Sequence, residues 1–136
     1  LLLQNIQKFC MIKHNQKLIK RKEKELSAYI KIINQVATVA KTNSDGNFVE
    51  VNDHLCIVTG YTKEELLTKN IRDITHDDAL NTSYVKIFAS MNNEQEWEGL
   101  HKGIDKDGEE FYLKISIIPE LNDSSNTLVD FIVIGF

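Results

Sequence analysis

The chain of 136 residues contains only two cysteines, Cys10 and Cys56, and no long apolar run. The cysteines lie far apart, form no CxxC pair and offer no metal-ligand spacing, so we expect a reduced cytoplasmic protein rather than a disulfide scaffold. No stretch approaches the roughly 18 apolar residues that a membrane-spanning helix needs. Residues 1–12 are apolar enough only for the inner end of such a span, which would make the chain the cytoplasmic portion of an inner-membrane protein.

Catalytic and phosphate-binding motifs are also absent from the sequence. It has no Gly-x-Ser-x-Gly elbow and no glycine-rich phosphate loop. His54 and Cys56 are two residues apart in a predicted helix, where side chains do not face each other as a catalytic pair must. The acidic residues after His76 are explained by helix capping rather than by a metal site. We therefore expect neither catalysis nor metal binding from this chain.

Acidic residues are scarce in the first 36 residues, and basic residues are outnumbered by acidic ones in the remainder. Residues 1–36 carry eight basic and only two acidic side chains, a net charge of +6. The whole chain has a net charge of −4, so the remainder carries −10. An acidic body argues against nucleic acid as a partner. The basic arm is typical either of a solvated helix face or of a segment just inside a membrane, and both readings stay open.

Glycine and proline are missing from residues 1–35, which are rich in Lys, Glu, Gln and Leu. This composition predicts one long helix. An apolar residue recurs every seven positions along it, as in a coiled coil, although the companion row is mostly polar before Leu26. Since isolated helices are marginal in water, we expect a parallel homodimer or a contact with the rest of the chain. The candidate dimer contacts are Ile12, Ile19, Leu26, Tyr29 and Ile33.

From residue 36 the apolar pattern alternates, as in strands. Residues 36–51 form a predicted hairpin with Asp45-Gly46 at its turn. Asp53 is expected to cap a short helix that stops at Gly60. Thr62 and Glu65 then form a capping box for the next short helix.

The second half of the chain predicts a helix and three more strands. A loop or single turn is expected over residues 70–78, and a longer helix starts at Asp77 or Asp78. The last strand is apolar on both faces, so it must be covered twice. Short helices cover one face, and the N-terminal helix is the candidate cover for the other, which consists of Leu128, Ile132, Ile134 and Phe136. The element order predicts an α+β domain.

Six short motifs in this order resemble the PAS domain, a sensory module of bacterial signalling proteins. They are "DGNFVEVN", "GYTKEEL", "THDD", "EWEG", "KDGEEFYLKISIIPEL" and "VDFIVIGF". The resemblance covers residues 35–136 and leaves residues 1–34 as an N-terminal linker or signalling helix. It implies a five-stranded antiparallel sheet with short helices on one face, enclosing a cavity that holds a cofactor, a small ligand or only side chains.

The resemblance implies a cytoplasmic sensor and dimerisation module from a histidine kinase, diguanylate cyclase or chemoreceptor. Because the chain begins with Leu1 rather than Met, we expect it to be a piece of such a longer protein. The missing output module is not identified by this sequence. Two alternatives stay open, an FAD-binding redox or oxygen sensor and a ligand-free structural dimerisation domain.

Two cofactors of PAS domains fit this sequence poorly. Ile71 stands where the FMN-binding photoreceptors carry their reactive cysteine, so no flavin–sulfur adduct can form. The positions that hold the flavin edge in those relatives are Gly103, Leu113 and Gly135, which carry no amide side chain. Haem-binding relatives place a histidine on the long helix, and the corresponding helix here has none.

FAD is the cofactor alternative that the residues leave open. Asn52, Asp53 and Trp97 match FAD-binding relatives, whereas the basic run and the turn arginine of those relatives are missing. A cavity is expected on the sheet face shared by Trp97 and His101, where glycines would leave room. The candidate ligand-binding residues are Asn52, Tyr84, Trp97, His101, Leu113 and Ile115.

Overall fold

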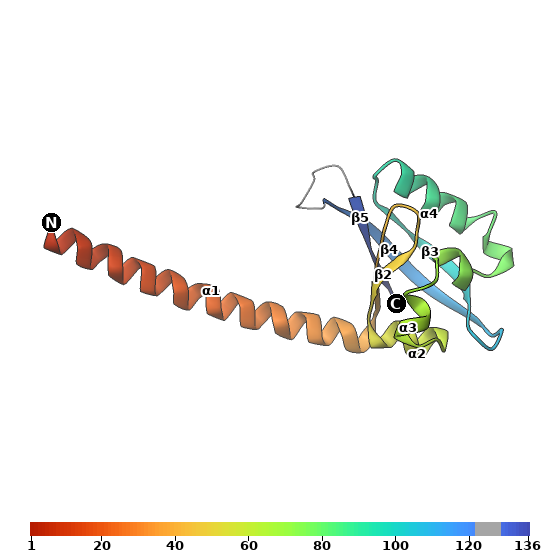
Figure 1. Ribbon diagram of the computed structural model, residues 1–136, viewed down its shortest axis with the longest axis horizontal. Coiled ribbons are helices and arrows are strands. Elements are labelled where there is room, and N and C mark those ends of the chain that lie inside the picture. The colour runs from red at the N-terminus through yellow and green to blue at the C-terminus, as the bar shows by residue number, and fades with distance from the viewer. Residues whose placement is uncertain (122–128) are drawn as a thin grey trace. The chain divides into compact units, whose positions relative to one another are not determined.

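The computed structural model describes residues 1–121 and 129–136 of the chain. These residues divide into two compact units, Leu1–Gln35 and Val36–Phe136. Each unit is described by itself below, and Figure 1 gives the labels of the helices and strands.

The first unit is the predicted long helix, α1, which spans Leu2–Val36. Its 35 residues contain neither glycine nor proline, so nothing in the sequence interrupts the backbone hydrogen bonds. None of its residues is buried. In the part of the chain that the structure describes, no helix is long and apolar enough to cross a membrane.

The second unit is built on one sheet of five antiparallel strands, as the sequence predicts. In space the strands follow the order β2-β1-β5-β4-β3, so β2 and β3 form the edges. Gly46 has a φ of 85° in the turn between β1 and β2, a backbone conformation that favours glycine. The strands are β1 (Thr38–Thr42), β2 (Phe48–Val51), β3 (Trp97–Ile104), β4 (Glu110–Leu121) and β5 (Val129–Gly135).

Short helices connect β2 to β3 and cover the inner face of the sheet (Figure 1). Among them, α3 has the predicted capping box, in which the Thr62 hydroxyl accepts from the Glu65 amide and the Glu65 carboxylate accepts from the Thr62 amide. The helices are α2 (Asp53–Thr59), α3 (Lys63–Leu66), the 3₁₀ helices η1 (Ile71–Ile74) and η2 (Asp77–Ala79), and α4 (Ser83–Asn92).

Two predicted helix starts are wrong. Asn52, not Asp53, caps α2: its side chain accepts a hydrogen bond from the Leu55 amide, and Asp53 is already helical. The longer helix, α4, begins at Ser83 rather than at Asp77 or Asp78, because Thr82 leaves the helical region with φ −123° and ψ −98°. Asp77 and Asp78 instead open the short helix η2.

The core lies between the sheet and these helices. Phe131 on β5 and Ile117 on β4 are completely buried beneath Leu66 of α3 and Ile87 and Met91 of α4. On the other face of β5, Ile132 and Ile134 are half-buried. Leu128, which was assigned to that face, lies outside the described residues. The cover of that face by α1 therefore stays a prediction.

Candidate functional site

A small cavity lies between the inner face of the sheet and the helices α2 and η1, where the sequence predicts a ligand site. Its volume is about 40 Å³, which is space for a few non-hydrogen atoms. All five strands contribute side chains to one wall of the cavity, and α2 and η1 form the opposite wall. The lining side chains are almost all apolar: Thr38, Ala40, Phe48, Leu55, Ile71, Ile74, His101, Phe111, Leu113, Ile115 and Val133.

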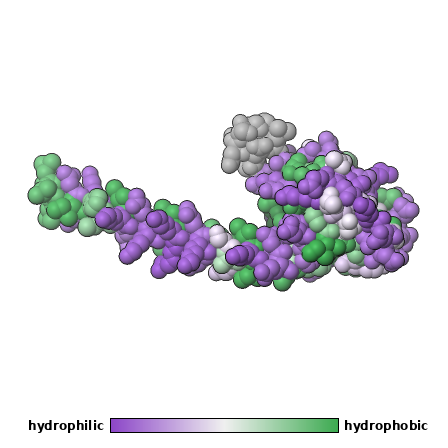
Figure 2. Space-filling view, turned by 60° about the horizontal axis from the view of Figure 1, so that its bottom comes forward, coloured by the Kyte–Doolittle hydropathy of each residue, from purple (hydrophilic) through white to green (hydrophobic). Residues whose placement is uncertain are grey.

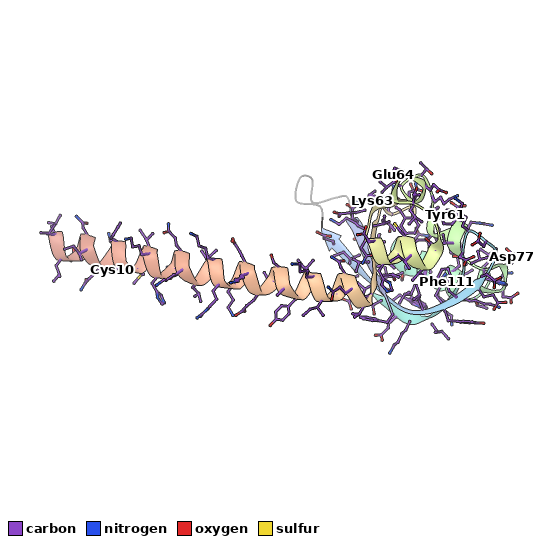
Figure 3. The ribbon with its side chains drawn as sticks, turned by 90° about the horizontal axis from the view of Figure 1, so that it is seen from below. Cys10, Tyr61, Lys63, Glu64, Asp77 and Phe111 are labelled. Atoms are coloured by element: carbon purple, nitrogen blue, oxygen red, sulfur yellow. The ribbon has the colours of Figure 1, made fainter. Side chains whose placement is uncertain are left out.

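The glycines of β3 do not leave the room that the sequence suggested. Phe111 on β4 is paired directly with Gly103, and its ring lies where a side chain on Gly103 would be. The Trp97 ring similarly covers Gly99, with its nearest atom 2.7 Å from the place of a Cβ atom. Figure 3 labels Phe111 on the side of the sheet where α2 lies. Aromatic rings thus fill much of the volume that the glycines open.

Among the described residues that line the cavity, His101 is the only ionisable one. Its side chain is buried, with 6% of the residue exposed, and both ring nitrogens have partners. The Ser83 hydroxyl lies 2.7 Å from Nδ1, and the Thr75 hydroxyl lies 3.1 Å from Nε2. The Thr75 hydroxyl donates its one hydrogen to the Ile71 carbonyl, at 2.8 Å. It must therefore accept from Nε2–H, and Nδ1 accepts from Ser83.

This arrangement holds the imidazole neutral. Burial lowers the pKa of His101 from 6.5 to about 4, because the charged ring would lose its hydration without gaining a carboxylate partner. The resulting hydrogen-bond chain runs from Ser83 on α4 through His101 on β3 to Thr75, at the end of η1. It therefore connects β3, at the edge of the sheet, to α4 and to the end of η1.

The six predicted site residues separate into two groups. His101, Leu113 and Ile115 line the cavity, whereas Asn52, Tyr84 and Trp97 do not. Tyr84 lies on α4, where its ring stacks on Phe88 with centroids 6.2 Å apart. A role of these residues in ligand binding stays a prediction.

Asn52 has a structural environment that its sequence position did not reveal. Its Oδ1 accepts from the amides of Val39 and Leu55, each at 3.0 Å, and its Nδ2 donates to the Ala37 carbonyl at 2.9 Å. The side chain thereby joins the start of α2 to Val39 of β1 and to Ala37, the residue just before β1. These hydrogen bonds tie its amide group to the backbone.

Trp97 lines an open groove between η2, α4 and β3. The groove has a volume of about 450 Å³, and Lys86, Lys102 and Tyr112 also line it. Lys102 is held at its rim by Asp78, with Nζ 2.8 Å from Oδ2, and by Glu110 at 3.4 Å. The hydrogen bond to Asp78 raises the pKa of Lys102 and lowers that of Asp78. This cluster fixes η2 against β3 and β4.

Sequence reasoning missed several residues of the site. Phe111 could have been found, because it alternates with Leu113 and Ile115 on one strand. Thr38, which lines the cavity, and Thr75 and Ser83, which contact His101, could not, since these contacts join distant parts of the chain. Within residues 1–121 and 129–136, no group of three or more His, Cys, Asp or Glu side chains could hold a metal ion.

A five-stranded antiparallel sheet with short helices over one face and a small cavity between them is the α+β architecture that the sequence motifs imply. Residues 35–136 match the family model described as "PAS domain". The chain therefore belongs to the PAS domain family, as the motifs in its sequence predict.

Solved structures of low sequence identity share the fold. A PAS domain from a two-component sensor histidine kinase is 22% identical, with a TM-score of 0.63 over 86% of this chain and 97% of that one. The PAS domain of a protein from Colwellia psychrerythraea is 17% identical, with a TM-score of 0.68 over 82% and 94% of the two chains.

A fungal LOV domain photoreceptor is 16% identical, with a TM-score of 0.65 over 74% of each chain. No curated protein gave a match to this chain. Because proteins of different kinds share this fold, the fold does not determine what this cavity binds.

Proposed function

We propose that this chain is the sensory and dimerisation module of a bacterial signalling protein, such as a histidine kinase, diguanylate cyclase or chemoreceptor, and that it works in the cytoplasm. The cavity would take a ligand of a few non-hydrogen atoms or serve only as a compressible part of the core. In either case a change of packing at the cavity would pass to α1.

The observation that carries this proposal is the position of Thr38. This residue lines the cavity and is the first residue of β1, two residues after Val36, the last residue of α1. Its hydroxyl donates to the Gly135 carbonyl on β5, at 3.2 Å. A change in the cavity therefore acts on the strand that continues directly from the helix.

Asn52 supports the same route. Leu55 lines the cavity from α2, and its amide donates to the Asn52 side chain that also holds Ala37 and Val39. Movement of α2 would thus be passed through the Asn52 side chain to Ala37 and Val39, which follow directly after α1. Such an element, in which a few hydrogen bonds connect a cavity wall to a helix, is what a two-state relay requires.

The FAD alternative is disfavoured by the size of the cavity. Sites for cofactors and drug-sized ligands usually have roughly 300–1,000 Å³, whereas this cavity has about 40 Å³. Phe111 and Trp97 cover the two glycines that would otherwise provide space. The ligand-free dimerisation domain remains as the second candidate, because a few atoms of packing space do not require a ligand.

Amide hydrogen exchange on the whole chain tests the relay. Leu55→Ala enlarges the cavity at the wall nearest Asn52, and we expect it to change the exchange rates of residues 30–36. The control is Met91→Ala, which removes a buried side chain of similar size from α4, away from the cavity. Equal exchange at residues 30–36 in both variants and in the unmodified chain would contradict the relay.

Native mass spectrometry of the purified chain tests the ligand. A bound mass of a few heavy atoms supports a ligand sensor, and a bound flavin would select the FAD alternative. An unliganded dimer whose helix still responds to Leu55→Ala supports signal relay without a ligand.

A further inference from the structure

One face of α1 combines apolar and basic side chains in a way that the sensory function does not require. Residues 2, 6, 9, 13, 17, 20 and 24 are spaced by three or four positions, so they lie on the same face of the helix. We call this row the α1 stripe, and it consists of Leu2, Ile6, Phe9, Lys13, Lys17, Lys20 and Lys24.

The stripe has two halves of different chemistry. Its first three side chains are apolar, and 75% of Leu2, 51% of Ile6 and 57% of Phe9 is exposed. Its other four are lysines, and the first of them, Lys13, places its Nζ 4.9 Å from the centre of the Phe9 ring. Figure 2 shows apolar colour at the N-terminal end of α1 and polar colour along its middle.

Charge complementarity identifies what this face fits. The only acidic residues of α1, Glu23 and Glu25, are not in the stripe, so its four lysines present one sign of charge over about half of its length of about 33 Å. A surface that accepts both exposed apolar side chains and a row of cations is the boundary between the acyl chains and the anionic headgroups of a membrane. Nucleic acid would accept the lysines but not the apolar half.

We propose that the α1 stripe binds the surface of an anionic lipid bilayer, with Leu2, Ile6 and Phe9 inserted between headgroups and Lys13, Lys17, Lys20 and Lys24 lying along the phosphates. The helix lies in the plane of the surface, because all seven side chains share one face. This inference does not rest on the proposed sensory function.

The stripe and the predicted dimer contact do not compete for the same face. The row of Ile12, Ile19, Leu26 and Ile33 is centred about 130° around the helix axis from the stripe. In heptad terms the lysines of the stripe occupy outer positions, which point away from a partner helix. The two-fold axis of a parallel dimer would turn the two stripes to opposite sides, so one stripe of each dimer would lie on a given bilayer.

Co-sedimentation of the full chain with lipid vesicles tests the proposal. We expect binding to vesicles of phosphatidylglycerol mixed with phosphatidylcholine at physiological ionic strength, and none to pure phosphatidylcholine. Each lysine should contribute about fivefold to the partition coefficient, so a chain with Lys13→Gln, Lys17→Gln and Lys20→Gln should bind on the order of 100-fold more weakly.

A matched variant removes the same charge from other faces of the helix. Lys8→Gln with Lys22→Gln deletes two positive charges, and we expect it to weaken binding less than about fivefold, whereas Lys13→Gln with Lys20→Gln should weaken it about 25-fold. Equal losses in these two double variants would show that net charge alone drives binding, and would overturn the assignment of a face. Failure of the unmodified chain to bind anionic vesicles would also overturn it.

The apolar half has its own test. Leu2→Gln with Phe9→Gln should weaken vesicle binding by at least about tenfold, whereas Leu1→Gln with Met11→Gln, on other faces, should not. A short DNA duplex serves as the competing partner. If the duplex binds as tightly as anionic vesicles do, and the Leu2/Phe9 variant binds vesicles normally, the stripe is a nucleic-acid surface and the proposal is wrong.

Discussion

At the scale of single residues, His101 couples the cavity to pH. Its pKa is about 4 in the folded protein, whereas an unfolded histidine has its ordinary value of 6.5. Between these two values the unfolded chain binds more protons than the folded one, so this histidine makes stability rise with pH. Its stabilisation is fully present above pH 6.5, is lost as the pH falls towards 4, and amounts to about 3 kcal/mol at most.

His101→Gln should flatten this part of the stability profile. Denaturant unfolding of the unmodified chain should show a free energy of unfolding that falls as the pH is lowered from 6.5 to 4.5, and the variant should lose much less over the same interval. His14→Gln, which removes an exposed histidine from α1, should keep the slope of the unmodified chain. The same slope in all three proteins would place the His101 ring in water rather than in the core.

Asn52 and Asp53 provide a second comparison of single residues, because neighbouring side chains have different roles. Asn52 makes three hydrogen bonds to backbone groups, including the cap of α2. Asn52→Ala should therefore lower the free energy of unfolding by about 2–3 kcal/mol. Asp53→Ala should cost less than about 1 kcal/mol, since Asp53 contributes only a favourable charge to the first turn. Urea unfolding distinguishes the two variants. If both lower the free energy of unfolding by similar amounts, Asn52 is not the residue that caps α2.

At the scale of helices and strands, one of the eight residue pairs between β3 and β4 places an aromatic ring over a glycine. The Phe111 ring occupies the place of a side chain on Gly103, so Gly103→Ala should displace the ring and cost about 1–3 kcal/mol. The same change made together with Phe111→Leu should cost less, because the smaller side chain leaves the space free.

A double-mutant cycle over these two positions measures the effect. The unfolding free energies of the two single variants and the double variant give the coupling energy. We expect the double variant to be less destabilised than the sum of the single variants, by about 0.5–3 kcal/mol. Independent costs, with a coupling energy near zero, would mean that the ring does not lie over the glycine.

Elements whose signals are local were predictable from the sequence. The absence of glycine and proline predicted α1, and Thr62 with Glu65 predicted the start of α3, because both depend on neighbouring residues. The start of α4 was missed, since the break at Thr82 carries no side-chain cap that a sequence pattern could reveal. Gly103 was taken as empty space because its cross-strand partner, Phe111, depends on the register of β3 and β4.

The same distinction holds for the candidate site. Leu113 and Ile115 were placed at the cavity by strand alternation alone, and His101 by its position between two glycines. Asn52 was predicted to bind a ligand, and this stays a prediction. Its hydrogen bonds to backbone groups up to 15 residues away could not be predicted from the sequence. The sequence motif around Asn52 therefore predicted that a helix starts there, whereas its hydrogen bonds to Ala37 and Val39 became visible only in the structure.

At the scale of the whole molecule, the division into a basic helix and an acidic unit makes association depend on salt. Residues 1–36 carry a net charge of +6, so two parallel copies of α1 would repel each other. Salt screens this repulsion, with a Debye length of about 8 Å at physiological ionic strength, whereas the apolar contacts between the helices are not weakened. A dimer held by α1 should therefore strengthen as salt is added.

The dimer contact itself can be tested on the row of Ile12, Ile19, Leu26, Tyr29 and Ile33. Leu26→Ser with Ile33→Ser should weaken the dimer at least about tenfold, because apolar residues at the seam supply the association energy. The control is Ile6→Ser with Phe9→Ser, which removes two exposed apolar side chains from another face and should leave dimerisation nearly unchanged.

Deletion of residues 1–25 should weaken the dimer and leave Val36–Phe136 folded, since those residues form a compact unit of their own. Sedimentation equilibrium measures all of these, and a monomer at high micromolar concentration in physiological salt would contradict the dimer and leave α1 with the bilayer surface as its partner.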